Sequence, residues 1–177
     1  IKNHQIAYLE GYLWDNEKAK QAMKKMVDIC KADQQKIAFT LSDLFCVDRH
    51  RDSFKDLIES DVDILFGNQD EFNAMVNSTN LDDGIAYAKS LNILAIITLE
   101  GKGSLIIVND KVIEIKPVPV SKLVDTTGAG DLFAAGFLYG ITHQKSYEES
   151  GRLASIAASE IISHFGARPK VKLSKLI

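Results

Sequence analysis

The sequence is poor in cysteine, proline and tryptophan and carries no excess of positive charge. It has two cysteines, three prolines and one tryptophan among 177 residues, and its 21 lysines and arginines are outnumbered by 24 aspartates and glutamates. Two cysteines outside any CxxC pair exclude a disulfide scaffold and a cysteine-rich zinc site, and they favour a reducing cytoplasm. The net charge of -3 supplies no polybasic surface. We therefore expect no nucleic-acid partner.

Long hydrophobic runs are also missing. The stretch 91–99 is interrupted by Asn92 and Thr98 and falls far short of the roughly 20 apolar residues that span a bilayer. We expect no membrane segment. A hydrophobic content of 46% with 25% charged residues is typical of a globular protein with a sizeable core. The chain starts at Ile1 and enters a strand-like segment almost at once, so we interpret it as part of a longer protein whose signal peptide cannot be judged.

Hydrophobic patterning predicts alternating strands and helices. Strands are expected at 5–9, 37–41, 62–66 and 93–98, and helices at 19–30, 51–59, 71–76 and from a cap at Asp82 or Asp83 to 91. A hairpin at 105–108 and 112–115 follows, and then helices that open within 125–131 and run over 147–165, the last one closed by Gly166. This order predicts a single α/β domain over residues 1–177, with a mostly parallel sheet covered by helices on both faces and a hairpin annex.

A glycine-rich segment stands at the expected start of the first of these two helices. Small residues at Gly128, Ala129 and Gly130 allow successive backbone amides to face one point, which makes a cradle for an anion such as phosphate. Asp131 lies in the same first turn and could accept the proton of an alcohol held beside that phosphate. The pairing fits phosphoryl transfer. From these residues alone, an ordinary glycine turn explains the pattern equally well.

Two other nucleotide-binding motifs are absent. A dinucleotide fingerprint would require glycine at the position of Phe133, and a Walker A loop would require GK[ST]. Elsewhere, Asn68 and Glu71 stand one helical turn apart, where an amide and a carboxylate share a face and can hold the water shell of Mg²⁺. The alternative is a capping box, in which Asn68 caps a helix and Glu71 reaches back to it.

Residues 125–137 read DTTGAGDLFAAGF and closely resemble the second signature of the ribokinase-like, or PfkB, carbohydrate kinases. The resemblance implies that Asp131 is the catalytic base. It implies an anion hole for the transferred phosphate at Thr126, Gly128, Ala129 and Gly130. Residues 68–71 match the family's NxxE motif, which implies that Asn68 and Glu71 organise Mg²⁺ and phosphate, with no direct protein ligand of the metal assigned.

The resemblance extends to the nucleotide site. Residues 98–103 are similar to the family's T-x-G-x-x-G loop, in which Thr98 and Gly103 fit and Glu100 departs. We expect Gly101 to supply the missing flexibility one place later, and a plain turn into the hairpin is the alternative. In the last helix a serine stands where many relatives carry an adenine-contacting His or Asn. That serine is Ser155. The small residues expected either to line an adenine slot or to serve close helix packing are Ala154, Ala158 and Ser159.

The remaining polar and aromatic residues carry weaker signals. No histidine has ligand spacing, and we place His164 at the end of the last helix. Arg49 and Arg51 could reach an anionic ligand, although solvated charges at a helix start are the simpler interpretation. Tyr12 and Trp14 could floor a sugar or base pocket, but aromatic residues at a strand exit are usually core.

The motif order resembles the C-terminal catalytic and nucleotide-binding portion of a PfkB kinase, without its lid. The resemblance implies ATP and Mg²⁺ as cofactors, leaves a monovalent cation and a homo-oligomer open, and implies phosphorylation of a sugar or nucleoside hydroxyl. Residues 10–15 and 42–51 look most like bacterial adenosine-kinase-like sugar kinases, so adenosine is the first acceptor we expect. Because much of the acceptor site would lie outside this piece, the piece alone could be inactive. The alternative is a noncatalytic nucleotide-binding or regulatory module with the same fold.

Overall fold

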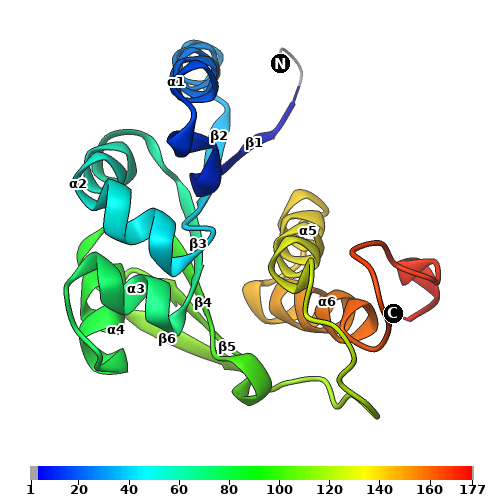
Figure 1. The fold of residues 1–177 in the computed structure, drawn as a ribbon. Helices are drawn as coiled ribbons and strands as arrows, with labels where there is room; N and C mark the ends of the chain where they lie inside the picture. Colours follow the sequence, from blue (N-terminus) through cyan, green and yellow to red (C-terminus); the bar gives the residue numbers. More distant parts are fainter. Residues whose placement is uncertain (1–3, 177) are drawn as a thin grey trace. The chain divides into compact units, whose positions relative to one another are not determined.

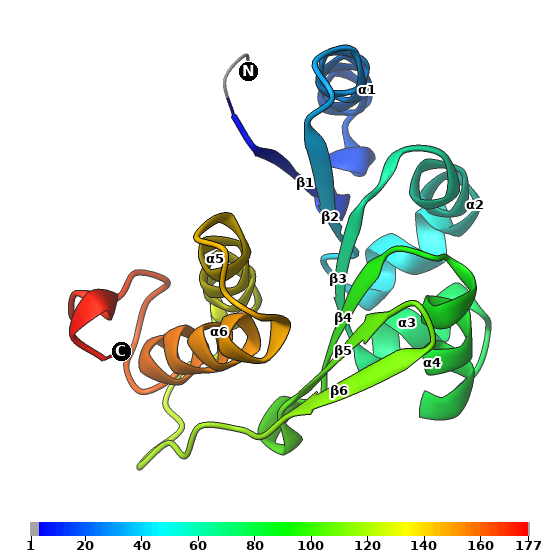
Figure 2. The same cartoon turned by 180° about the vertical axis from the view of Figure 1, so that it is seen from behind.

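A computed structural model describes residues 4–176, which pack as two compact units. Within the described range, the first unit holds 4–98 and 107–112, and the second holds 99–106 and 113–176. The helices and strands, traced in Figures 1 and 2, are β1 (Ile6–Glu10), α1 (Glu17–Ala32), β2 (Lys36–Thr40), α2 (Leu44–Asp61), β3 (Ile64–Asn68), α3 (Gln69–Met75), α4 (Leu81–Ser90), β4 (Leu94–Thr98), β5 (Ser104–Val108), β6 (Lys111–Ile115), α5 (Ala129–Thr142) and α6 (Tyr147–Ile161). Short 3-10 helices are η1 (Gly11–Asp15), η2 (Glu100–Lys102) and η3 (Leu173–Lys175).

The strands form one six-stranded sheet in the order β1-β2-β3-β4-β5-β6. β1 to β4 pair in parallel, so their carboxyl ends, where ligands of such sheets gather, share one edge. In the first unit α1 to α4 lie on one face of these strands (Figures 1 and 2), as successive right-handed crossovers between adjacent strands require. The sequence-based expectation of an α/β fold with mainly parallel strands and a terminal hairpin is confirmed.

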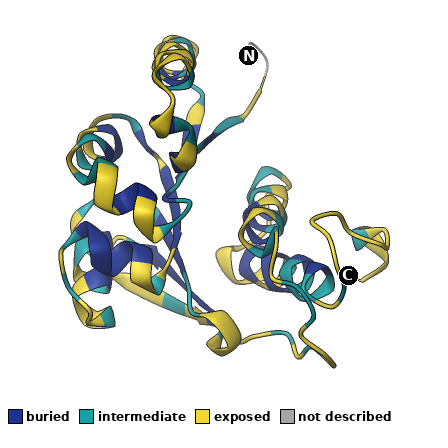
Figure 3. Cartoon of the chain, viewed as in Figure 1, coloured by how far each residue is buried: buried dark blue, intermediate teal, exposed yellow. Residues whose placement is uncertain are grey.

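The first helix shows why its hydrophobic pattern predicts a helix. The Asn16 side chain accepts hydrogen bonds from the amides of Lys18 and Ala19, which caps α1. Its apolar stripe buries Met23, Val27 and Cys30 against the sheet, while the intervening lysines face solvent. Figure 3 shows the same division in the first unit, with buried strands and half-buried helices.

Both cysteines are free and buried, as expected. Burial raises the pKa of Cys46 to about 12, with the Asp43 carboxylate beside it adding to the effect. A thiol with so high a pKa carries almost no thiolate near neutral pH, so it is a core residue rather than a nucleophile.

Two predicted helix starts are wrong. α2 begins at Leu44 instead of residue 51, because the Asp43 carboxylate accepts a hydrogen bond from the Cys46 amide and caps the helix there. α4 is capped by Asn80, not by Asp82 or Asp83, which lie in its first turn where the helix dipole favours carboxylates.

α6 ends at Ile161, four residues before the predicted end at residue 165. Beyond it, the Ile162 carbonyl accepts a hydrogen bond from the Val124 amide at 2.9 Å, a contact with a distant segment. His164 therefore lies past the helix instead of in its last turn.

In the second unit α5 and α6 pack closely because small residues face each other. A Cβ added to Gly136 would lie 2.8 Å from the Ala154 Cα, and one added to Gly140 would lie 2.4 Å from the Ser150 Oγ. The hairpin of β5 and β6 turns at Asn109, whose φ of 53° is the left-handed conformation that such a turn requires. None of the helices in residues 4–176 combines the length and apolarity needed to cross a lipid bilayer.

Candidate active site

The start of α5 has the features of an anion cradle. Gly128, the N-cap residue, has a left-handed φ of 81°, and no side chain caps the helix. A Cβ added to Gly130 would meet nothing within 4 Å, so a ligand can approach this backbone closely. The first amides of a helix lack intrahelical acceptors and concentrate its positive dipole. The Ala129 amide already donates to the Thr126 carbonyl at 3.1 Å.

Asp131 is exposed in the first turn of this helix. Its carboxylate stands at the positive end of the helix dipole. An exposed carboxylate beside the first amides of a helix can accept a proton from a hydroxyl that those amides help to place against a phosphate.

The loop that enters α5 is held by a second carboxylate, Asp125. Its Oδ1 accepts hydrogen bonds from the Thr127 amide at 2.9 Å and from the Thr127 hydroxyl at 2.7 Å. Its Oδ2 accepts one from the Gly166 amide at 3.0 Å. These three donors, the Thr127 hydroxyl first, lower the pKa of Asp125 to about 2, with the nearby His164 adding to the effect. Thr126 itself is exposed and contributes its carbonyl to the turn.

The predicted nucleotide loop forms a tight turn into β5. The Leu99 amide donates to the Gly103 carbonyl at 2.8 Å, and Gly103 has a φ of 101° that only glycine adopts readily. The expectation for Gly101 is wrong: Glu100 takes the left-handed conformation, with a φ of 51°, at the position where the family pattern has glycine. The turn thus keeps the left-handed backbone conformation that the family pattern assigns to glycine, but a glutamate adopts it here at a cost in conformational energy.

Asn68 and Glu71 form a complete capping box at the start of α3. The Glu71 amide donates to Asn68 Oδ1 at 2.8 Å, while the Asn68 amide and Nδ2 donate to the two carboxylate oxygens at 2.9 and 2.8 Å. The cap interpretation is therefore confirmed. A role in holding Mg²⁺ stays a prediction, and it is compatible with the cap because each carboxylate oxygen retains a second lone pair.

Glu71 is also unusually enclosed. Its residue is 5% exposed, and a Cβ added to Gly67 would lie 3.0 Å from its Oε2. Burial raises its pKa to about 7 against the hydrogen bond from the Asn68 amide, and the charge of Asp43 adds to the rise. A divalent cation nearby would favour the ionised carboxylate, so Glu71 is a fitting partner for a hydrated metal.

The raised pKa of Glu71 predicts a stability that falls with rising pH. The folded protein holds this proton more tightly than the unfolded chain, whose ordinary pKa is 4.5. The stabilisation is therefore full below about pH 4.5 and is lost as the pH rises through about 7. Relative to Glu71→Gln, the free energy of unfolding should drop by roughly 2 kcal/mol between about pH 5 and pH 7.5. Urea denaturation in metal-free buffer measures it.

The control for that measurement is Asp70→Asn, which removes one exposed carboxylate from the same helical turn. If wild type and Glu71→Gln change in parallel across this range, the pH dependence does not belong to Glu71. A drop that disappears equally in Asp70→Asn would contradict it as well.

Thr98 is brought next to the capping box. It ends β4 and is the cross-strand partner of Asn68 in the parallel register of β3 and β4. The sequence placed both residues at strand ends, and the register now places them side by side at the carboxyl edge of the sheet.

The three small residues of α6 differ in exposure. Ala154 is completely buried and packs against Gly136 of α5, as the helix-packing alternative predicted. Ser155 is 8% exposed and donates its hydroxyl to the Gly151 carbonyl at 2.9 Å. Ala158 is half-buried. An adenine contact by these residues stays a prediction.

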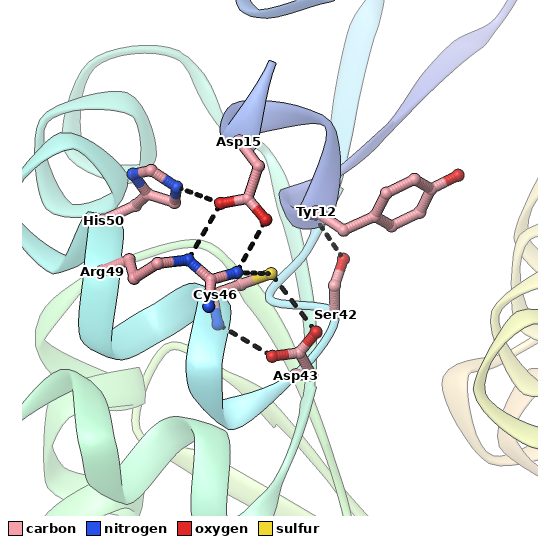
Figure 4. Close-up of polar contacts among 7 residues, drawn as sticks. All are labelled: Tyr12, Asp15, Ser42, Asp43, Cys46, Arg49 and His50. Atoms are coloured by element: carbon pink, nitrogen blue, oxygen red, sulfur yellow. Dashed lines mark hydrogen bonds and ion pairs between the residues drawn. The ribbon is translucent and has the colours of Figure 1, made fainter.

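A polar cluster joins η1 to the start of α2 (Figure 4). Asp15 accepts hydrogen bonds from Arg49 Nε at 3.0 Å and Nη2 at 2.7 Å, and His50 Nε2 lies 2.6 Å from Asp15 Oδ1. These contacts, Arg49 first, lower the pKa of Asp15. Arg51 donates through Nε to the Ala74 carbonyl at 2.7 Å. Both arginines lie inside α2 and not at its start, and both are paired. The Arg49 side chain is nevertheless 49% exposed, so the expectation of a solvated charge holds for it.

The two aromatic residues of η1 have different environments. Trp14 is 4% exposed and packs edge-on against Phe54, so it is core as expected. Tyr12 is 50% exposed, which contradicts the core interpretation, and its amide donates to the Ser42 Oγ at 3.2 Å.

The sequence does not predict the contacts between the loop that enters α5 and the segment that follows α6. The motif gives Asp125 no separate role, because its hydrogen bond to the Gly166 amide joins residues 41 positions apart. Glu160 was not singled out, although its spacing of four residues from His164 is a readable signal.

Known proteins resemble this chain over most of its length. The model of the pfkB family of carbohydrate kinases matches residues 1–173. A solved adenosine kinase from Sinorhizobium meliloti is 38% identical with a TM-score of 0.96, over 98% of this chain and 54% of that one. A probable sugar kinase from Rhizobium etli CFN 42 is 37% identical with a TM-score of 0.95, over 97% and 52%. The fold is thus ribokinase-like.

Curated relatives match shorter stretches. A nucleoside kinase from Methanocaldococcus jannaschii is 35% identical over 106 residues, which are 59% of this chain and 34% of that protein. A ribokinase from Arabidopsis thaliana is 33% identical over 123 residues, 66% of this chain and 32% of that protein. The matches span about half the length of the solved structures and about a third of these curated relatives.

Proposed function

Because the chain belongs to the pfkB family of carbohydrate kinases, we propose that it transfers the terminal phosphoryl group of ATP to a hydroxyl of a sugar or nucleoside. The observation that carries the proposal is the start of α5, where an open glycine backbone adjoins an exposed carboxylate. Positioning and charge stabilisation supply most of the catalysis in such transfers, and this arrangement offers both.

In the proposed reaction Asp131 accepts the proton of the acceptor hydroxyl. The hydroxyl oxygen bonds to the terminal phosphorus of ATP while the bond from that phosphorus to the bridging oxygen breaks, and ADP leaves. The amides around Gly128 and Gly130, aided by the helix dipole, stabilise charge on the transferred group. The proton then passes from Asp131 to solvent, which reaches this exposed residue.

We assign the metal role to the capping box. Mg²⁺ bound with the nucleotide neutralises phosphate charge. Asn68 and Glu71 would hold Mg²⁺ through its water shell. They already hydrogen-bond to each other, so further contacts through water suit them better than direct coordination. A monovalent cation, a homo-oligomer and a cytoplasmic location stay predictions.

For the nucleotide we assign the turn at Thr98, Gly101 and Gly103, together with Ala158 and its neighbours Ala154 and Ser155. The exposed backbone of η2 supports the first part. The assignment of the α6 residues depends on Ala158, because Ala154 and Ser155 are buried.

Adenosine is the acceptor we propose first. The support is the similarity to the adenosine kinase of Sinorhizobium meliloti, at 38% identity over nearly the whole chain, and to the nucleoside kinase of Methanocaldococcus jannaschii. The similarity to a probable sugar kinase, at 37%, keeps sugars as the second class.

Acceptor-dependent ADP formation by the full-length protein tests this function. With ATP and Mg²⁺ held constant, adenosine, other nucleosides, ribose and fructose phosphates are compared, and mass spectrometry identifies the phosphate ester. We expect the highest kcat/KM with adenosine. ATP binding without ADP formation from any acceptor would favour the noncatalytic module, which the glutamate at position 100 of the nucleotide turn would suit.

A further inference from the structure

The segment that follows α6, residues 162–170, lies against the loop that enters α5. The Ile162 carbonyl accepts a hydrogen bond from the Val124 amide at 2.9 Å, and the Gly166 amide donates to Asp125 Oδ2 at 3.0 Å. Asp125 in turn fixes Thr127 through two hydrogen bonds. The position of the segment therefore determines how the carboxylate directly before the glycine cradle is held.

The same segment closes the space behind the cradle. A Cβ added to Gly128 would lie 3.1 Å from the Ala167 Cβ and 3.3 Å from its Cα. A Cβ added to Gly130 would meet nothing within 4 Å. The cradle is thus crowded by Ala167 at Gly128 and open at Gly130, so a shift of Ala167 would reach Gly128 directly.

One side chain from the end of α6 anchors this segment. Glu160 Oε1 accepts a hydrogen bond from the Lys170 amide at 2.9 Å, ten residues further along, and lies 3.0 Å from His164 Nε2. The Glu160 and His164 side chains are 8% and 10% exposed. Exposed ion pairs are worth little, but a shielded carboxylate with two donors is a strong anchor.

The surroundings of Glu160 and His164 offer these two side chains few other hydrogen-bond partners. His164 Nδ1 lies 3.3 Å from the Phe165 carbonyl, so both ring nitrogens face acceptors. Among residues 4–176, Glu160 Oε2 is buried with no hydrogen-bond partner. Loss of the carboxylate would leave the Lys170 amide and the His164 ring without this acceptor and would release the two points at which Glu160 holds the segment.

We propose that Glu160 is a positioning residue for the kinase reaction, acting through His164 and Lys170 on the segment that supports Asp125 and Gly128. The inference rests on the proposed function for its catalytic consequence. Its structural basis, the link from Glu160 to Gly166, is independent of any substrate.

A simpler alternative is that Glu160 only stabilises the last turn of α6. An i, i+4 pair of Glu160 and His164 would suffice for that. The bond to the Lys170 amide goes beyond it, because it joins the helix to the far end of the loop and encloses Gly166 and Ala167 between two fixed points.

The experiment compares Glu160→Ala, Glu160→Gln and the control Glu148→Ala, an exposed glutamate of the same helix, in the full-length protein. Amide hydrogen exchange at Gly166 and Lys170 is followed by NMR without substrate, and kcat and KM are measured with ATP and adenosine. In Glu160→Ala we expect exchange at both amides to accelerate about tenfold and kcat to fall about tenfold, with a nearly unchanged adenosine KM. Glu160→Gln, which keeps an acceptor oxygen, should restore most of both values. Glu148→Ala should match wild type.

A variant that lowers only the melting temperature, with exchange at Gly166 and kcat unchanged, would overturn the proposal in favour of helix stabilisation. Failure of glutamine to rescue would overturn the role of the acceptor oxygen. If Glu160→Ala does not fold, Lys170→Pro removes the same amide donor and should produce the same pair of effects. Faster exchange in a protein that phosphorylates no acceptor would overturn the proposed function and the catalytic part of this inference, while the link to Gly166 stands.

Discussion

Replacing Asp131 by asparagine is expected to lower kcat of the full-length protein by about 10²–10⁴-fold. Asparagine has nearly the same shape and can still hydrogen-bond to a hydroxyl, but it cannot take up a proton. Because Asp131 is exposed in the first turn of α5, the change removes no buried contact and should leave the melting temperature nearly unchanged. The measurement is steady-state ADP formation with adenosine, together with the Kd for ATP, which should change little.

Asp110→Asn is the matched control, since this exposed aspartate lies in the hairpin turn between β5 and β6. It should retain wild-type kcat. If Asp131→Asn keeps kcat within about threefold of wild type, Asp131 is not the base and the proposed mechanism is wrong. If wild type and Asp131→Asn both bind ATP and neither phosphorylates any acceptor, the noncatalytic alternative gains support.

Replacing Gly103 by alanine is expected to destabilise the fold by about 3 kcal/mol or more. A Cβ at this position would lie 2.1 Å from the Ile115 carbonyl oxygen and 3.0 Å from the Pro117 nitrogen, both backbone atoms that cannot rotate away. In addition, the φ of 101° is strained for any residue with a side chain. The midpoint of urea denaturation measures the loss.

Gly101→Ala is a close control, two residues away in the same turn. A Cβ there would meet nothing within 4 Å, so alanine should be neutral or slightly stabilising through its smaller unfolded-state entropy. Equal destabilisation by the two substitutions would show that the turn tolerates no change for a reason other than the predicted contact with Ile115.

The two glycines show where sequence reasoning reached its limit in this loop. The motif correctly predicted a turn with a glycine at position 103. It also led us to expect that Gly101 would supply the flexibility that Glu100 lacks. In the structure Glu100 adopts the left-handed conformation with a φ of 51°, which costs a non-glycine residue about 1–2 kcal/mol. The hydrogen bonds of the turn, from Leu99 to Gly103 and from Gly103 to Glu100, hold it there. A residue-by-residue motif comparison contains no information about such compensation.

The end of α6 illustrates the same limit for helix boundaries. Its apolar residues continue past Ile161, so periodicity alone extends the helix to Phe165, which is in fact 77% exposed. The chain leaves the helix because the Ile162 carbonyl is taken by Val124 and the Gly166 amide by Asp125. Both partners lie about forty residues earlier, beyond the reach of any local pattern.

What the sequence determined by itself is whatever depends on neighbouring residues: the strand and helix order, the hairpin turn at Asn109, the capping box of Asn68 and Glu71, and the glycine cradle followed by Asp131. These follow from periodicity, capping and backbone freedom, which act within a few residues. Only the tertiary structure decided that Thr98 lies beside Asn68, that burial raises the pKa of Glu71 to about 7, and that Glu160 ties the segment behind Gly128. Each of these depends on strand register, on desolvation or on a contact across a loop, and such effects arise only when distant parts of the chain pack together.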